Sequence, residues 1–340
     1  MDNYEKNNSF DFENDDDVTY QSYTATKSGK KKTSSSNIIL AILFIVVIVL
    51  VIIVVKNSIG GDNTDDTTTS STQATTTLPQ NFTTLELSQE DIAKGELVLI
   101  NSKHYYEYDA LQGLKNLYDV KTSSYYLKDA NTILVNKNIW PAVNALFDGF
   151  YEATQKRSIN IIGAFRSHTD QMHLFNSYVD SYGSEAEALK HVQKPGYSEH
   201  HSGLCIDLQI WDSDKQVVYE FTGEGEYKWL VDNAYKYGFI QRYPEGKTSI
   251  TGVNTELGHF RYIGVAHATA MKKNNASCYE TYIEYLRNFT FDGEHLHVEC
   301  DNGEKYEIFF SNSLTIQVPT DREYTVSGNN VDGFIVTIKN

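Results

Sequence analysis

The chain is short of basic residues and cysteines. Its 340 residues include 29 Lys and Arg against 45 Asp and Glu, and the formal net charge is -16 at pH 7. This balance argues against nucleic acid as a partner, because a nucleic-acid-binding protein neutralises phosphates with basic side chains. Only 3 cysteines are present and none forms a Cys-x-x-Cys spacing, so the sequence does not indicate a thiolate zinc site.

One long apolar run lies between polar segments. Residues 38–55 are rich in Ile, Val and Leu, and at 1.5 Å per residue they reach about 27 Å, the thickness of a bilayer hydrocarbon core. A buried element of a globular domain is one alternative, but both flanks are polar. A cleaved signal peptide is the other, but residues 56–60 (KNSIG) do not provide a small-x-small cleavage site. We therefore predict an uncleaved transmembrane helix.

Basic residues near the run set its orientation. Lys27 and residues 30–32 (KKK) precede it, whereas only Lys56 lies at its far end. Since positive charge stays inside, we predict a single-pass protein of the cell membrane with a cytoplasmic N-terminus and everything after residue 55 outside the cell.

Composition divides the rest of the chain. Residues 1–37 and 56–84 lack apolar periodicity, so we predict a disordered cytoplasmic tail and a flexible Thr/Ser-rich linker. Residues 85–288 form the main exported domain. Residues 289–340 show short alternating stretches with Asp-Gly and Asn-Gly turns, which predict a small β-rich extension.

Within residues 85–288 the apolar spacing predicts both helices and strands. The predicted helices are 138–156, 170–181, 226–237 and a segment ending near 273, and the predicted strands are 97–100, 159–165, 204–210 and 260–263. There is no regular β-α-β rhythm. The expected fold class is therefore α+β, with an antiparallel core sheet and flanking helices.

Three groups of polar residues are candidates for chemistry. They are the segment 198–207 (SEHHSGLCID), Glu256 with His259, and Arg166 with Gln171. Catalytic zinc takes three His or carboxylate ligands, leaves one position open and needs a base nearby. The spacing alone leaves a metal site and unrelated surface histidines as equal alternatives, because the residues are scattered along the chain.

The order of these motifs resembles that of the VanY-type D-alanyl-D-alanine carboxypeptidases, which are zinc-dependent LAS-type metallopeptidases. Ser198-x-His200-x-x-Gly203-x-x-x-Asp207 resembles the family's SxHxxGxAxD signature. The similarity covers roughly residues 95 to 288, and it continues in order through Phe165-Arg166-Ser167 with Gln171, Trp229-Leu230, Asn233-Ala234, Tyr237-Gly238-Phe239-Ile240, Arg242-Tyr243-Pro244, Thr251-Gly252 and Glu256-x-x-His259-Phe260-Arg261-Tyr262-Ile263-Gly264.

The resemblance implies a role for each candidate. His200, Asp207 and His259 are expected to bind Zn2+, Glu256 to act as general base, and Arg166 to hold the substrate's terminal carboxylate with help from Gln171 and Ser198. A guanidinium suits that role because it binds a carboxylate through two parallel hydrogen bonds. The implied activity is removal of the terminal D-alanine from peptidoglycan stem peptides, and we expect a monomer.

The chain departs from the family pattern at three positions. Gly258 stands where the family has Trp, Phe165 stands where it has Tyr, and Cys205 falls near a usual small residue. Two other activities stay open, an L,D-carboxypeptidase acting on tetrapeptide stems and an endopeptidase. The expected binding of a terminal carboxylate by Arg166 favours an exopeptidase. A non-catalytic zinc or wall-binding module also stays open, although Glu256 argues against it.

Other histidines and cysteines have simpler interpretations. His201 is expected to point away from the metal, and His295 and His297 to lie on a solvated strand face, with an accessory metal site as the alternative. A disulfide between Cys278 and Cys300 is left open, whereas Cys205, in an apolar strand, is expected to be a buried free thiol.

Overall fold

A computed structural model describes residues 81–110 and 113–340. In this part of the chain no helix is long and apolar enough to cross a membrane. The predicted tail, the transmembrane helix at 38–55 and the linker up to residue 80 lie outside the described residues.

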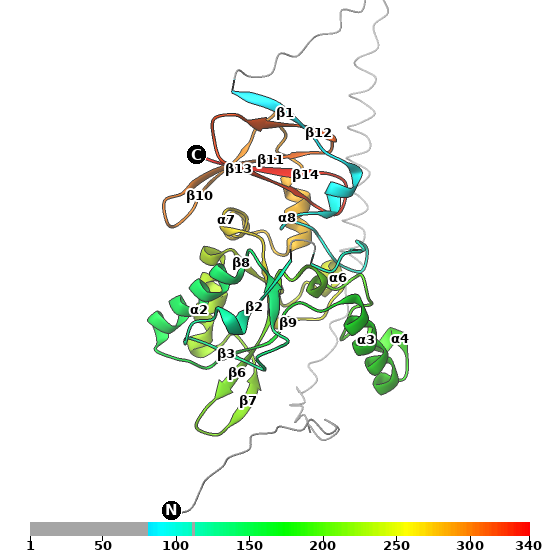
Figure 1. The fold of residues 1–340 in the computed structure, drawn as a ribbon, viewed down its shortest axis with the longest axis vertical. Coiled ribbons are helices and arrows are strands. Elements are labelled where there is room, and N and C mark those ends of the chain that lie inside the picture. Colours follow the sequence, from blue (N-terminus) through cyan, green and yellow to red (C-terminus); the bar gives the residue numbers. More distant parts are fainter. Residues whose placement is uncertain (1–80, 111–112) are drawn as a thin grey trace, which may run out of the picture. The chain divides into compact units, whose positions relative to one another are not determined.

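The largest sheet of the described part has six strands, in the order β3-β5-β6-β9-β8, with β7 paired to the far half of β6 (Figure 1). Its strands are β3 (Tyr126–Leu127), β5 (Ile159–Gly163), β6 (Cys205–Asp212), β7 (Val217–Glu220), β8 (Phe239–Tyr243) and β9 (Glu256–Tyr262). Every pair is antiparallel except β3 with β5, which is parallel. The predicted antiparallel core sheet is therefore correct except at this edge.

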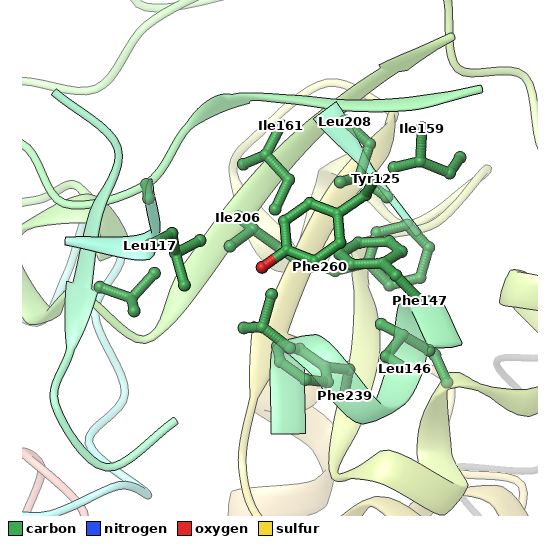
Figure 2. Close-up of a cluster of buried hydrophobic side chains, with 14 of the residues drawn as sticks. Leu117, Tyr125, Leu146, Phe147, Ile159, Ile161, Ile206, Leu208, Phe239 and Phe260 are labelled. Carbon is green, nitrogen blue, oxygen red and sulfur yellow. The ribbon is translucent and has the colours of Figure 1, made fainter. Parts of the chain in front are cut away.

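Helix α2 (Trp140–Thr154) covers one face of this sheet, and this packing explains the spacing of the apolar residues in the helix. Val143, Leu146, Phe147 and Phe150 recur at intervals of three and four residues, and all are fully buried. Figure 2 shows Leu146 and Phe147 among core side chains from the strands, with Tyr125 beside them: Ile159, Ile161, Ile206, Leu208, Phe239 and Phe260. This core fixes β6 and β9, the two strands on which the candidate site is built.

Of the remaining helices in the described part, α3 (His168–Tyr182) is as long as α2 and the others are shorter. They are α4 (Glu185–Ala188), α5 (Lys228–Asn233), α6 (Thr248–Thr251), α7 (Val265–Lys273), α8 (Tyr279–Leu286), and the 3-10 helices η1 (Gln89–Ala93), η2 (Leu117–Asp119), η3 (Glu199–Ser202), η4 (Gly225–Tyr227) and η5 (Ala234–Tyr237). Helix α3 begins two residues earlier than predicted because Ser167 caps it, accepting a hydrogen bond from the backbone N–H of Asp170. The predicted helix 226–237 is divided into η4, α5 and η5, and it ends at Gly238, whose φ is 85°.

The C-terminal extension is β-rich, as its turns indicate. A four-stranded sheet has the order β10-β11-β14-β13, and β12 pairs instead with β1, near the start of the described chain. The bounds are β1 (Phe82–Glu86), β10 (Leu296–Glu299), β11 (Lys305–Ser311), β12 (Thr315–Pro319), β13 (Tyr324–Gly328) and β14 (Phe334–Lys339), and a separate pair is formed by β2 (Leu114–Asn116) and β4 (Leu134–Asn136). The domain start predicted at residue 85 thus falls inside β1, which belongs with the extension.

The segment 97–100 is not a strand, which corrects the prediction made from its apolar run. All four residues are buried, but Leu99 makes one backbone hydrogen bond, to the carbonyl of Asn329, instead of a ladder. Burial alone therefore produced the apolar pattern there.

The structure shows the surroundings of the cysteines and of His295 and His297. All three cysteines lie in the described part of the chain and are buried free thiols, so Cys278 and Cys300 are not paired. His297 is exposed as predicted. His295 is not solvated, because its two ring nitrogens contact the Glu307 carboxylate and the carbonyl of Phe291.

Candidate metal centre and substrate cleft

The pairing of β6 with β9 brings the predicted ligands together. Asp207 lies directly opposite His259 in this ladder, and His200 precedes β6 in η3, whose end is turned by Gly203 at a φ of 67°. The Asp207 Oδ1 lies 2.8 Å from Nδ1 of His259, and its Oδ2 lies 3.1 Å from Nε2 of His200. The two imidazole rings are perpendicular, with centroids 5.1 Å apart.

These atoms fit a zinc ion in chemistry and spacing. Bonds of 2.0–2.2 Å in tetrahedral geometry place ligand atoms about 3.3 Å apart, close to the two separations observed. The Nδ1 of His200 lies against the carbonyl of Ala164, an acceptor that fixes the proton on Nδ1 when the ring is neutral and leaves Nε2 toward Asp207. Cys205 also lies near both imidazoles, but its Sγ is 3.5 Å from Nδ1 of His200, the nitrogen already occupied by Ala164. We therefore infer that Asp207, rather than Cys205, completes the ligand set.

Charge within the cluster favours an ionised Asp207. Burial raises the pKa of this carboxyl, but His200 and His259 outweigh it and hold the pKa well below its ordinary value. Burial lowers the pKa of His200 while Asp207 raises it, and the result is a pKa of about 9. A metal ion must displace protons from the same nitrogens, so its binding will depend on pH.

Glu256, the predicted base, lies on the metal side of His259. Its Oε2 is 3.9 Å from Nδ1 of His259, and its side chain keeps 39% of its surface exposed toward the cleft. Burial of the carboxyl raises the pKa of Glu256 above its ordinary value. A raised pKa makes a carboxylate a stronger base.

The sequence interpretation missed Gly163, at the end of β5. A Cβ atom at this position would lie 2.6 Å from Oδ2 of Asp207, so only glycine leaves room for the carboxylate. The ladder between β5 and β6 is irregular at this point. A glycine inside an apolar strand was the available signal, since it marks a bulge or a close approach.

Arg166 follows β5 and is held by several contacts. Its backbone N–H donates to the carbonyl of His200 at 3.1 Å, and its carbonyl accepts from Nδ1 of His201 at 2.8 Å. Its Nη1 donates to Oε1 of Gln171 at 2.9 Å. His201 therefore points away from the metal ligands, as expected, and Gln171 contacts the guanidinium itself.

All seven predicted site residues line one cleft of about 320 Å3. They are Arg166, Gln171, Ser198, His200, Asp207, Glu256 and His259. Residues up to 93 positions apart along the chain thus share one cavity, which is the size of a small-ligand site.

Gly258, which stands where the family has Trp, lies where the structure leaves little room for a side chain. A Cβ atom there would lie 2.6 Å from the carbonyl oxygen of Leu208 and 3.3 Å from Cβ of Phe221. Phe221 is buried, lines the cleft and packs edge-to-face on Phe260 with ring centroids 5.7 Å apart. An aromatic ring therefore stands next to Gly258, although it comes from another segment.

Comparison with known proteins agrees with this geometry. Residues 132–265 match VanY, described as D-alanyl-D-alanine carboxypeptidase. A D-alanyl-D-alanine carboxypeptidase of Enterococcus faecium is 35% identical over 265 residues, covering 76% of this chain and 80% of that protein. The chain belongs to the VanY family. Another D-alanyl-D-alanine carboxypeptidase, from Enterococcus faecalis, is 30% identical over 217 residues, covering 60% of this chain and 71% of the relative.

A solved structure supports the fold of this VanY family member. The crystal structure of the vancomycin resistance D,D-dipeptidase VanXYg, in complex with a D-Ala-D-Ala phosphinate analogue, has a TM-score of 0.66 and 28% sequence identity, and the match covers 76% of this chain and 99% of that one. The predicted family and carboxypeptidase class are confirmed, and so is a mixed α/β peptidase fold. The roles of individual site residues stay predictions.

Proposed function

We propose that this chain is a zinc-dependent D,D-carboxypeptidase that removes the terminal D-alanine from peptidoglycan stem peptides. One observation carries the proposal: the carboxylate-binding candidate Arg166, the candidate base Glu256 and the three metal-ligand candidates line a single cleft. The D-alanyl-D-alanine carboxypeptidases to which the chain is similar support the substrate class.

Different residues of the chain bind the substrate, transfer the proton and hold the metal. Arg166, held by Gln171, binds the free carboxylate of the last residue and so selects a chain end. Glu256 takes a proton from the attacking water and delivers it to the leaving amine. Zinc, when bound by His200, Asp207 and His259, would polarise the scissile carbonyl and lower the pKa of the water. Ser198 is buried at the cleft wall and is proposed to assist in substrate binding.

The experiment uses the full-length chain, loaded with zinc and incubated with pentapeptide and tetrapeptide stems. The products are identified by mass spectrometry beside a Glu256→Gln control. Loss of one D-alanine from the pentapeptide, absent in the control, supports the proposal. Shortening of the tetrapeptide alone would favour the L,D reaction, and binding without cleavage would favour a non-catalytic module.

We also propose that the enzyme is anchored in the membrane by one helix and works outside the cell. The support is the apolar run at residues 38–55 and the lysines before it. Carbonate extraction of membranes, followed by protease treatment of intact cells, tests this topology. Release of the protein by carbonate or protection of its C-terminal part from protease would contradict it.

A further inference from the structure

A buried carboxylate that takes no part in the proposed reaction lies behind His259. Glu199 is the neighbour of His200 in η3, and its side chain is fully buried. Its Oε1 accepts a hydrogen bond from Nε of Arg242 at 2.8 Å and lies 3.1 Å from Nη1 of Arg261. Its Oε2 faces Nε2 of His259 at 3.5 Å, an approach too long for a hydrogen bond, and the structure gives neither of these two buried atoms a hydrogen-bond partner.

The charge on Glu199 is balanced within the fold. Arg242 donates through Nη1 and Nη2 to both carboxylate oxygens of Glu280 in α8, at 2.9 and 2.7 Å. Two guanidiniums and two carboxylates thus form a buried set with no net charge. Glu199 is paired with the guanidiniums of both Arg242 and Arg261, and this pairing holds its side chain as a carboxylate anion.

The orientation of His259 makes this anion relevant to the metal centre. Its Nδ1 faces Asp207 and its Nε2 faces Glu199. Nδ1 can bind a metal through its lone pair only if the ring proton sits on Nε2, and a carboxylate acceptor stabilises that tautomer. The Cys205 thiol also lies near the ring, but a thiol is a weak acceptor.

We propose that Glu199 is a positioning residue that orients His259 and keeps its proton on Nε2, so that Nδ1 is presented to the metal. Replacing this carboxylate by an amide leaves one buried guanidinium charge unbalanced beside a cation site and weakens the acceptor at Nε2. Both effects lower metal affinity. The inference rests on the proposed zinc site.

The test measures the zinc Kd of the full-length chain by competition with a chelator, without assaying activity. Glu199→Gln should bind zinc about 10- to 100-fold more weakly than the unmodified chain. The matched control is Glu280→Gln, which disturbs the same buried charges but does not contact His259. This control should lower the stability of the zinc-free protein in urea and weaken zinc binding far less than Glu199→Gln, because it leaves the carboxylate acceptor at Nε2 of His259 in place.

A second measurement needs no variant. In the zinc-loaded, unmodified chain, the Nε2 proton of His259 should appear in a 15N-edited NMR spectrum, shifted downfield by its charged acceptor. Zinc binding by Glu199→Gln equal to that of the unmodified chain, an equal loss in Glu280→Gln, or a His259 ring protonated on Nδ1 would each overturn the inference. If the unmodified chain binds no zinc, the proposed metal site itself fails.

Discussion

Gln171 accepts a hydrogen bond from Nη1 of Arg166, and its own amide donates to the carbonyl of Gln193 at 2.6 Å. Gln171 is completely buried, so it cannot turn away to another partner. The guanidinium is therefore fixed before a substrate arrives. A side chain ordered in advance loses less entropy when it binds a ligand.

Gln171→Ala should release this guanidinium and weaken carboxylate binding. A hydrogen bond to a charged group contributes about 1.5–3 kcal/mol, so we expect kcat/KM to fall roughly 10- to 150-fold, mainly through KM. The matched control is a stem peptide with a C-terminal amide, which offers no carboxylate. The unmodified enzyme should cleave it poorly, and Gln171→Ala should lose little more. A full additional loss on the amide would show that Gln171 acts elsewhere.

The pH dependence of activity should reflect the raised pKa of Glu256. The base works only when ionised, so activity is lost as pH falls through its pKa. Because burial raises that pKa, the acid limb of kcat/KM should lie above the ordinary carboxyl value of 4.5. Zinc binding is measured at the same pH values to separate metal loss from base protonation. An acid limb below 4.5 with zinc retained would contradict the assignment.

Gly163→Ala should damage the metal centre without exposing the core. The added methyl would lie 2.6 Å from Oδ2 of Asp207, so the carboxylate must move away from His200. We expect zinc affinity to fall at least about 10-fold, as for loss of a ligand-orienting contact. Gly246→Ala is the control for backbone strain outside the cleft lining, because its φ of 72° strains an alanine while the added methyl meets nothing within 4 Å. Equal zinc affinity in both variants would show that Asp207 tolerates the shift.

The sequence predicts the site better than the fold boundaries. His200, Asp207 and His259 belong to motifs whose order resembles a known family, and the β6–β9 ladder places them together. Gly163 and Glu199 escaped prediction for a physical reason. Their partners, Asp207 and His259, are 44 and 60 positions away, and only the tertiary fold makes them neighbours.

Local pattern also failed where tertiary contacts decide the backbone. Residues 97–100 have the composition of a strand, but only one backbone–backbone hydrogen bond is recorded for them, and side chains such as those of Ser327 and Tyr279 bond to the backbone of Leu97 instead. The pairing of β1 with β12 joins residues more than 200 positions apart, and no periodicity within either strand identifies such a partner.

Gly258→Trp, which supplies the residue usual in the family, should destabilise this chain. The obstacle is the backbone oxygen of Leu208, 2.6 Å from the new Cβ, and it cannot be removed by trimming a side chain. Overpacking of this kind costs about 1–3 kcal/mol, measurable by urea unfolding. Adding Phe221→Ala should not restore stability. A gain in stability for the double variant would mean that Phe221, rather than the backbone, excludes a side chain at 258.

His267 should make the stability of the protein depend on pH. The ring is buried between α7 and β14, with Nδ1 against the hydroxyl of Tyr282 and Nε2 against that of Thr337, each at 2.8 Å. Burial lowers the pKa of His267 from 6.5 to about 3. Above pH 6.5 the folded and unfolded chains are both neutral here. As pH falls from 6.5 toward 3, only the unfolded chain takes up the proton, so stability declines across this window.

Urea unfolding at pH 7.5 and pH 5 measures this decline. His267→Gln disturbs the buried hydrogen bonds of the ring, so the free energy of unfolding should be lower at pH 7.5. Because the new side chain does not titrate, this free energy should change less between the two pH values. His173→Gln is the control, because His173 is exposed and its loss should leave the pH dependence as in the unmodified chain. If the decline were the same in His267→Gln, the acid sensitivity would have to come from other groups. If it were smaller in both variants, the effect would not be specific to the buried ring.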